Sequence, residues 1–139
     1  MTYRRTIILF LILILIYAGL LNSVPKPSSQ NPKEPKKLFD KGKKLFYRKN
    51  YEEAAENFRK ITIEFSNHQL SDDSFYWLGY SLHKLSEQLD NLDQILSTQK
   101  EALANLDILI KKFSSSTWFD DAKRLKLEIA ADLVDKGFK

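Results

Sequence analysis

The sequence predicts an all-α protein, with an N-terminal membrane helix followed by a small domain of paired antiparallel helices. Three observations predict this class. An uncharged, strongly apolar stretch occupies the N-terminus. All four prolines lie within residues 25–35, and there are only four glycines in 139 residues, so the rest of the chain has few helix breakers. Two segments beyond residue 50 are similar to one another, which indicates a repeated structural unit.

Residues 1–24 are expected to form a membrane anchor, which crosses the bilayer through residues 7–21. Twelve of those fifteen residues are Ile, Leu or Phe, and their summed insertion free energy is about −5 kcal/mol. Such a helix is apolar on every side, which a small globular domain cannot surround. Cleavage as a secretory signal segment is the alternative, although small residues at cleavage-site spacing are missing.

The charges beside the apolar stretch predict its orientation. Arg4 and Arg5 favour a cytoplasmic N-terminus, which makes the chain a single-pass membrane protein with an exported C-terminal domain. In a bacterium, this arrangement is an inner-membrane protein whose domain lies in the periplasm. Lysines on the other flank weaken that preference. A periplasmic product released by signal cleavage and a domain that faces the cytoplasm therefore remain alternatives.

Residues 25–35 read as an extended, proline-rich linker. From Lys26 to Lys49 there are nine basic and two acidic residues, a net charge of +7, whereas the chain from Asn50 onward has a net charge of −5. A solvated helix next to the membrane explains this excess most simply. Attraction to anionic lipid or to an acidic partner is the functional alternative.

The repeat aligns residues 53–73 with residues 101–121, without gaps, at an offset of 48. Seven of the 21 aligned positions are identical, far more than unrelated segments share. Each copy reads as the second helix of a hairpin, a loop and the start of the next helix. Asn50 with Glu53, and Thr98 with Glu101, have the spacing of a capping box. The expected helices of the domain at residues 36–139 are about 36–49, 51–65, 72–90, 99–113 and 118–136.

Each predicted second helix carries an apolar stripe that begins with an alanine, either Ala54 or Ala102. Each predicted first helix carries a glycine, either Gly42 or Gly79. Glycine inside a helix costs about 1 kcal/mol relative to alanine. Its recurrence therefore predicts that two helices approach closely at that point.

The spacing of Gly42, Ala54 and Phe58 resembles the consensus of tetratricopeptide repeat proteins. The stretch from Asp72 to Tyr80 is similar to the bacterial envelope branch of that family, which includes BamD-like and YbgF-like proteins. This resemblance implies a solenoid of two helical hairpins with a C-terminal capping helix. It also implies a protein–protein interaction module that binds its partner on the concave face formed by the first helix of each hairpin.

An alternative reading of the second hairpin is one continuous helix. Leucines recur at alternating four- and three-residue spacing from Leu78 onward, and no Gly or Pro interrupts the chain between Tyr80 and Phe113. A helix of about 40 residues would span about 60 Å. It would make the protein a membrane-anchored coiled-coil homo-oligomer.

No pattern of catalytic, cofactor-binding or metal-binding residues stands out. The chain has no cysteine, and its two histidines, His68 and His83, lack further ligands at metal-site spacing. The aspartate pairs at residues 72–73 and 120–121 occupy equivalent helix N-termini, where they favour the helix dipole. The net acidic charge beyond Asn50 argues against nucleic-acid binding. The sequence therefore predicts neither an enzyme nor a cofactor.

Counting from the matched glycines places a set of aromatic and basic residues on the expected concave face. Aromatic rings interleaved with cations suit a protein segment that is part apolar and part acidic. Several of these rings are equally compatible with a place in the core. The expected groove residues are Phe39, Lys43, Phe46, Tyr47, Tyr76, Tyr80, His83 and Lys84.

Overall fold

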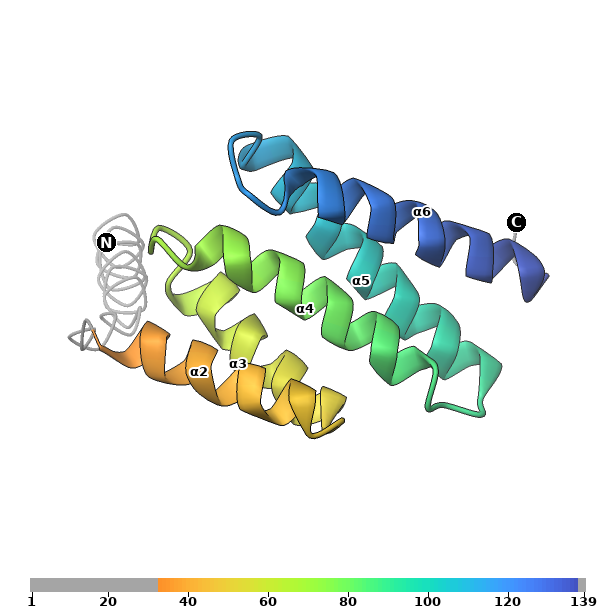
Figure 1. The fold of residues 1–139 in the computed structure, drawn as a ribbon. Coiled ribbons are helices and arrows are strands. Elements are labelled where there is room, and N and C mark those ends of the chain that lie inside the picture. The colour runs from red at the N-terminus through yellow and green to blue at the C-terminus, as the bar shows by residue number, and fades with distance from the viewer. Residues whose placement is uncertain (1–32, 138–139) are drawn as a thin grey trace, which may run out of the picture. The chain divides into compact units, whose positions relative to one another are not determined.

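The computed structural model describes residues 33–137, and every regular element in that part of the chain is a helix (Figure 1). The predicted all-α class is thereby confirmed. Successive helices are joined by short loops and reverse direction. The helices are α2 (Glu34–Tyr47), α3 (Tyr51–Glu64), α4 (Ser71–Ser86), α5 (Leu92–Lys112) and α6 (Phe119–Asp135).

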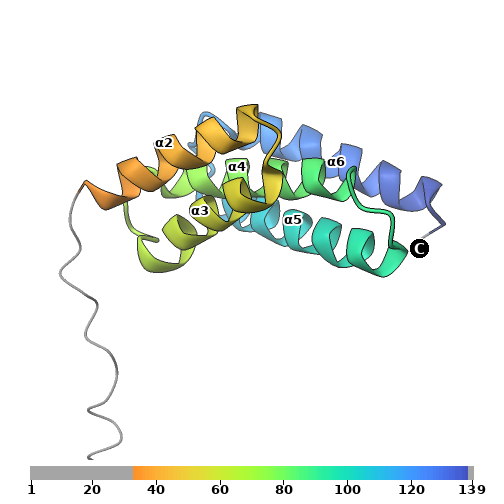
Figure 2. The ribbon, with the colours of Figure 1, turned by 90° about the horizontal axis from the view of Figure 1, so that it is seen from below.

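The five helices form two layers, which Figure 2 shows from the side. Helices α2, α4 and α6 lie in one layer, and α3 and α5 lie in the other. Helix α4 is central, because it packs against each of the other four described helices. The core fills the space between the layers and includes Phe58, Leu78, Leu106 and Ile129, all essentially inaccessible to solvent.

The sequence repeat is also a repeat of local structure. In both loops a phenylalanine ends the preceding helix, and the same sequence of backbone hydrogen bonds leads into the next helix. Each donor and acceptor of the first loop has its counterpart 48 residues later. The bonds run from the amide nitrogen of Phe65 to the carbonyl of Ile61, His68 to Phe65, Ser71 to His68 and Ser74 to Leu70, and again from Phe113 to Leu109, Ser116 to Phe113, Phe119 to Ser116 and Ala122 to Trp118.

The two helical glycines lie where helices approach most closely. A Cβ atom on Gly42 would lie 2.8 Å from ring atoms of Phe58, and one on Gly79 would lie 2.8 Å from Cγ and Cδ2 of Leu106. Phe58 and Leu106 occupy the same place in the two sequence copies. The close approach predicted from the recurring glycine is therefore present in both hairpins, with a large buried side chain as the contact.

The start of the fourth helix was predicted wrongly. Helix α5 begins at Leu92 and not near residue 99, because the side chain of Asn91 caps it by accepting a hydrogen bond from the amide of Gln94 (3.0 Å). Thr98 therefore lies inside the helix and caps nothing. Asn50 does precede α3, but its side chain donates to Oε1 of Glu53 (2.9 Å) and accepts no backbone bond.

The continuous-helix alternative is contradicted by the break at residues 87–91. Helix α4 ends at Ser86 and not near residue 90, and the chain then reverses into α5. The start of α4 and the end of α5 lie side by side, as the ring centroids of Phe75 and Phe113, 5.8 Å apart, show. Leu78 and Leu106, which the coiled-coil reading placed on an intermolecular seam, are buried within the domain.

The predicted anchor at residues 1–24 and most of the linker at residues 25–35 lie outside the described residues. Within residues 33–137, no helix combines the length and the hydrophobicity needed to cross a membrane. The chain from Pro32 to Lys139 forms a compact unit of its own.

Candidate functional site

Aromatic side chains from α2, from α4 and from the residue just before α6 gather on the layer of α2, α4 and α6. We call Tyr47, Tyr76, Tyr80 and Trp118 the aromatic face. The rings of Tyr76 and Trp118 are stacked, with centroids 4.2 Å apart and planes inclined by 12°, and Tyr80 lies 6.0 Å from Tyr76. Phe46 lies 4.9 Å from Tyr80, on the side toward the core. Tyr47 is 70% exposed, whereas the other three side chains of the face are partly buried.

A buried tryptophan and a lysine support this face from α2 and α4. Trp77 is only 6% exposed, and its ring packs edge-on against that of Phe46, with centroids 5.2 Å apart. The ammonium group of Lys43 lies 3.6 Å from the ring centroid of Trp77 and 5.5 Å from that of Tyr47. A cation so placed interacts favourably with the ring electrons. Lys43 therefore holds the C-terminal end of α2 against α4 and contributes a positive charge to the edge of the aromatic face.

Carboxylates fix the stack on its other side. The indole N–H of Trp118 donates a hydrogen bond to Asp73, in the first turn of α4. Burial raises the pKa of the Asp73 carboxyl, although the bond from Trp118 opposes that shift. Burial, reinforced by the negative charge of Asp121, raises the pKa of Tyr76 to about 12. The stacked rings thus lie in a partly desolvated setting with an acidic border.

The predicted groove residues separate into two groups. Lys43, Phe46, Tyr47, Tyr76 and Tyr80 come together at the aromatic face, with Phe46 buried beneath it. The other three, Phe39, His83 and Lys84, lie elsewhere.

The prediction that His83 lines the groove is wrong, because its side chain is fully buried and is not available to a partner at the surface. Its Nε2 atom lies 3.5 Å from carboxylate oxygens of Glu87 and Glu128. Lys84 forms an ion pair with Glu87 (2.7 Å). Phe39 packs edge-on against Phe58, with centroids 5.5 Å apart, and so belongs to the margin of the core.

Two members of the aromatic cluster, Trp77 and Trp118, were missing from the sequence prediction. Counting from the glycines selected positions on α2 and α4 only, so Trp118, at the start of α6, was not considered. The repeat contained the relevant signal, because Trp118 aligns with Leu70 at the offset of 48. The side chain at that position lies against the preceding helix α4, where Trp118 stacks on Tyr76.

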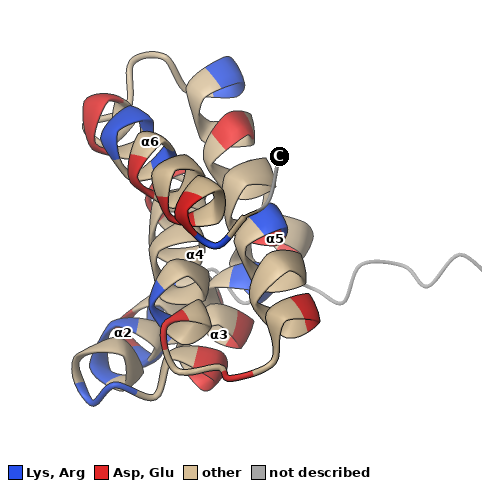
Figure 3. Ribbon diagram, turned by 90° about the vertical axis from the view of Figure 1, so that its right-hand side faces the viewer, with Lys and Arg blue, Asp and Glu red and all other residues tan. Residues whose placement is uncertain are grey.

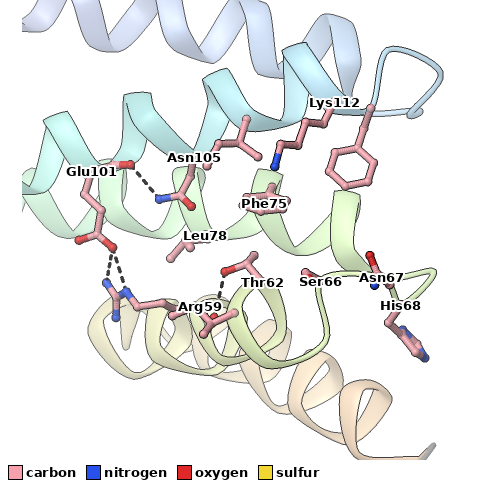
Figure 4. A pocket seen from close by; sticks show the side chains of 13 residues that line it. Arg59, Thr62, Ser66, Asn67, His68, Phe75, Leu78, Glu101, Asn105 and Lys112 are labelled. Atoms are coloured by element: carbon pink, nitrogen blue, oxygen red, sulfur yellow. Dashed lines mark hydrogen bonds and ion pairs between the residues drawn. The ribbon is translucent and has the colours of Figure 1, made fainter. Parts of the chain in front are cut away.

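The opposite layer holds a separate cavity of about 770 Å³ between α3, α4 and α5 (Figure 4). Several of its polar side chains already have partners within the described residues. Arg59 forms an ion pair with Glu101 (2.8 Å), Thr62 donates to the carbonyl of Arg59, and Asn105 donates to the carbonyl of Glu101. Of the described lining residues, His68 also has a partner, since its Nδ1 accepts a hydrogen bond from the amide of Leu70 (3.2 Å).

Within the described residues, no group of three His, Asp or Glu side chains could hold a metal ion. Asp72 and Asp73 lie in the first turn of α4, and Asp120 and Asp121 in the first turn of α6, as the sequence predicted. In these positions carboxylates interact favourably with the helix dipole.

Comparisons with protein-family models, with curated proteins and with solved structures found no match.

Proposed function

We propose that this chain is a non-enzymatic interaction module of the bacterial envelope, similar to tetratricopeptide repeat proteins, with residues 7–21 as its membrane tether. Its aromatic face captures a segment of a partner protein. The duplicated loops and the paired glycine contacts support the repeat interpretation. The observation that carries the binding proposal is the ring cluster on the layer of α2, α4 and α6.

The rings of this cluster are well suited to binding because they are held before a partner arrives. Tyr76 stacks on Trp118, and Trp118 is fixed by its hydrogen bond to Asp73. Tyr and Trp contribute large contact areas, and side chains already held in place lose little conformational entropy on binding. Apolar side chains of the partner would lie on these rings, and an acidic group would lie beside Lys43.

Site-specific photo-crosslinking tests the location of the partner site. A benzophenone side chain replaces Tyr47 on the aromatic face, or Leu127 on α6 as the control. The two positions are matched, since they are 70% and 72% exposed. Irradiation of intact cells is expected to give a discrete product of higher mass from position 47 only. Equal products from both positions, or a product from position 127 alone, would refute the assignment.

Alanine substitution tests whether the same residues provide affinity. Replacement of Tyr47, Tyr76 and Tyr80 by alanine is expected to abolish capture of the crosslinked partner while the helical circular dichroism persists. The control variant replaces three exposed apolar residues outside the aromatic face, Ile63, Leu92 and Leu127, and is expected to capture normally. Undiminished capture by the tyrosine variant would show that the binding site lies elsewhere.

A C-terminal alkaline phosphatase fusion tests the proposed topology. The fusion is expected to be active, because the enzyme folds only after export and we place the domain in the periplasm. An inactive but stable fusion would reverse the orientation.

A further inference from the structure

The outward side of α2 carries a row of four cations. Lys37, Lys41, Lys44 and Arg48 follow one another at helical spacing, and all four are exposed. We call them the basic stripe. Because a helix rises 1.5 Å per residue, the stripe is about 17 Å long. None of the four forms an ion pair with another residue of the described part of the chain.

The acidic side chains of α2 do not neutralise this row. Glu34 forms an ion pair with Lys60 of α3 (3.1 Å), and Asp40 forms one with Lys36 (2.7 Å). Both carboxylates are therefore already matched by lysines outside the stripe. Figure 3 shows the resulting asymmetry, with basic residues predominating on α2 and acidic residues numerous on α6, at the other edge of the layer.

The basic stripe and the aromatic face lie on different sides of α2. At about 100° per residue, Gly42 and Phe46 mark the side of α2 that faces the core. Lys43 and Tyr47 lie on one flank of this core-facing side. The stripe lies on the other flank of the core-facing side, and its centre is about a quarter of a turn from Tyr47. A surface that contacts the stripe consequently leaves the aromatic face open.

We propose that the basic stripe lies against the anionic headgroups of the membrane that holds the tether. The inference rests on the proposed tether. The chain from Thr6 to Val24 is uncharged, and α2 begins only ten residues after Val24. Extended at about 3.1 Å per residue, the connecting segment reaches about 30 Å, so the stripe stays close to the bilayer. That length lets the stripe reach the headgroups, and anionic headgroups attract a basic segment that lies within about 10 Å of them.

The charge of the rest of the domain fixes the orientation of this contact. Residues from Asn50 onward carry a net charge of −5 and are repelled by an anionic surface. The domain therefore rests on α2 and turns α6 away. The aromatic face then opens parallel to the bilayer, where it meets partners that are themselves bound to the membrane.

Fluorescence quenching in liposomes tests this contact with the full-length chain. Because the chain has no cysteine, Lys44→Cys provides a single site for a dye on the stripe, and Leu127→Cys provides a site on α6. Liposomes contain phosphatidylcholine alone, or with about one third phosphatidylglycerol, plus a lipid with a spin label on its headgroup. We expect strong quenching at position 44 only with phosphatidylglycerol, and weak quenching at position 127 in both.

Glutamine at Lys37, Lys41 and Arg48 removes the remaining charges of the stripe. Each cation that is removed is expected to lower the equilibrium constant for headgroup contact about fivefold. The three substitutions together lower it about a hundredfold, which abolishes the quenching. The control replaces three exposed cations on α5 and α6 and is expected to retain it. Its substitutions are Lys100→Gln, Lys111→Gln and Lys123→Gln.

Flotation of every variant with the liposomes separates the two proposals. Chains that float but show the same quenching with and without the stripe would overturn the headgroup contact and leave the tether intact. Quenching that does not depend on phosphatidylglycerol would also overturn it, because the stripe's charge would then have no part in the contact. Chains that fail to float would refute the tether itself, and the headgroup contact with it.

Discussion

Replacing Gly79 by alanine is expected to destabilise the domain, although alanine is the better helix former. The added Cβ would lie 2.8 Å from Cγ and Cδ2 of Leu106 and 3.4 Å from the carbonyl oxygen of Ala102. Leu106 has no exposed surface, and the second neighbour is backbone, so neither has room to move aside. To reach ordinary contact, the two helices have to separate by about 0.6 Å.

Two opposing contributions determine the size of the effect. Gly79→Ala gains about 1 kcal/mol of helix propensity, whereas overpacking a buried contact costs about 1–3 kcal/mol. The net loss is therefore about 1 kcal/mol, which lowers the midpoint of thermal unfolding by about 4–6 °C for a domain of this size. Circular dichroism of residues 32–139, which form one compact unit, measures it.

Two further variants separate the contributions. Ala104 is exposed in the middle of α5, so Ala104→Gly measures the propensity contribution alone, with an expected loss of about 1 kcal/mol. In a Leu106→Ala background the added methyl group has space, and Gly79→Ala is expected to stabilise the domain. The reasoning would be refuted if Gly79→Ala stabilised the otherwise unaltered domain by about as much as Ala104→Gly destabilises it.

Three other predictions follow from the described contacts. Tyr76 is expected to ionise near pH 12, as measured by ultraviolet absorbance, and Asp121→Asn should lower that pKa. Because the pKa in the folded state is raised above the ordinary value of 10, Tyr76 contributes stability that is complete below pH 10 and is lost as the pH rises toward 12. A double-mutant cycle on Arg59 and Glu101 should give a coupling of about 0.2–1 kcal/mol, since both side chains are partly exposed, and a coupling above 3 kcal/mol would contradict this. Two glycines inserted after Gln88 should lower the free energy of unfolding, measured by chemical denaturation, by less than about 1 kcal/mol, because they only lengthen a loop. Loss of folding in this variant would contradict a reversal of the chain at that point.

The parts of the fold that the sequence predicted were those with a local or repeated physical cause. Gly42 and Gly79 were recognisable because glycine inside a helix needs a compensating contact, and both were found against large side chains. The aspartate pairs marked helix starts through the helix dipole. The start of α5 was missed because Thr98 and Asn91 are both acceptable caps, and the helix uses Asn91, whose side chain accepts a hydrogen bond from the amide of Gln94.

The candidate site was harder to predict because its composition depends on packing between distant helices. Counting positions along α2 and α4 identified Tyr47, Tyr76 and Tyr80, but the stacking partner Trp118 comes from a loop outside that count. His83 has the right spacing for the same surface, yet it is buried. Helical spacing gives the direction of a side chain, but not what the next helix places over it.

The reversal of the chain between α4 and α5 is the central structural claim, because it creates the layer that carries the aromatic face. Spin labels on cysteines introduced at Asp72 and Lys112, in a chain without native cysteine, measure it directly by pulsed electron resonance. Antiparallel packing predicts a separation of about 20 Å or less. A separation near 60 Å, the length of 40 residues in one straight helix, would contradict the account.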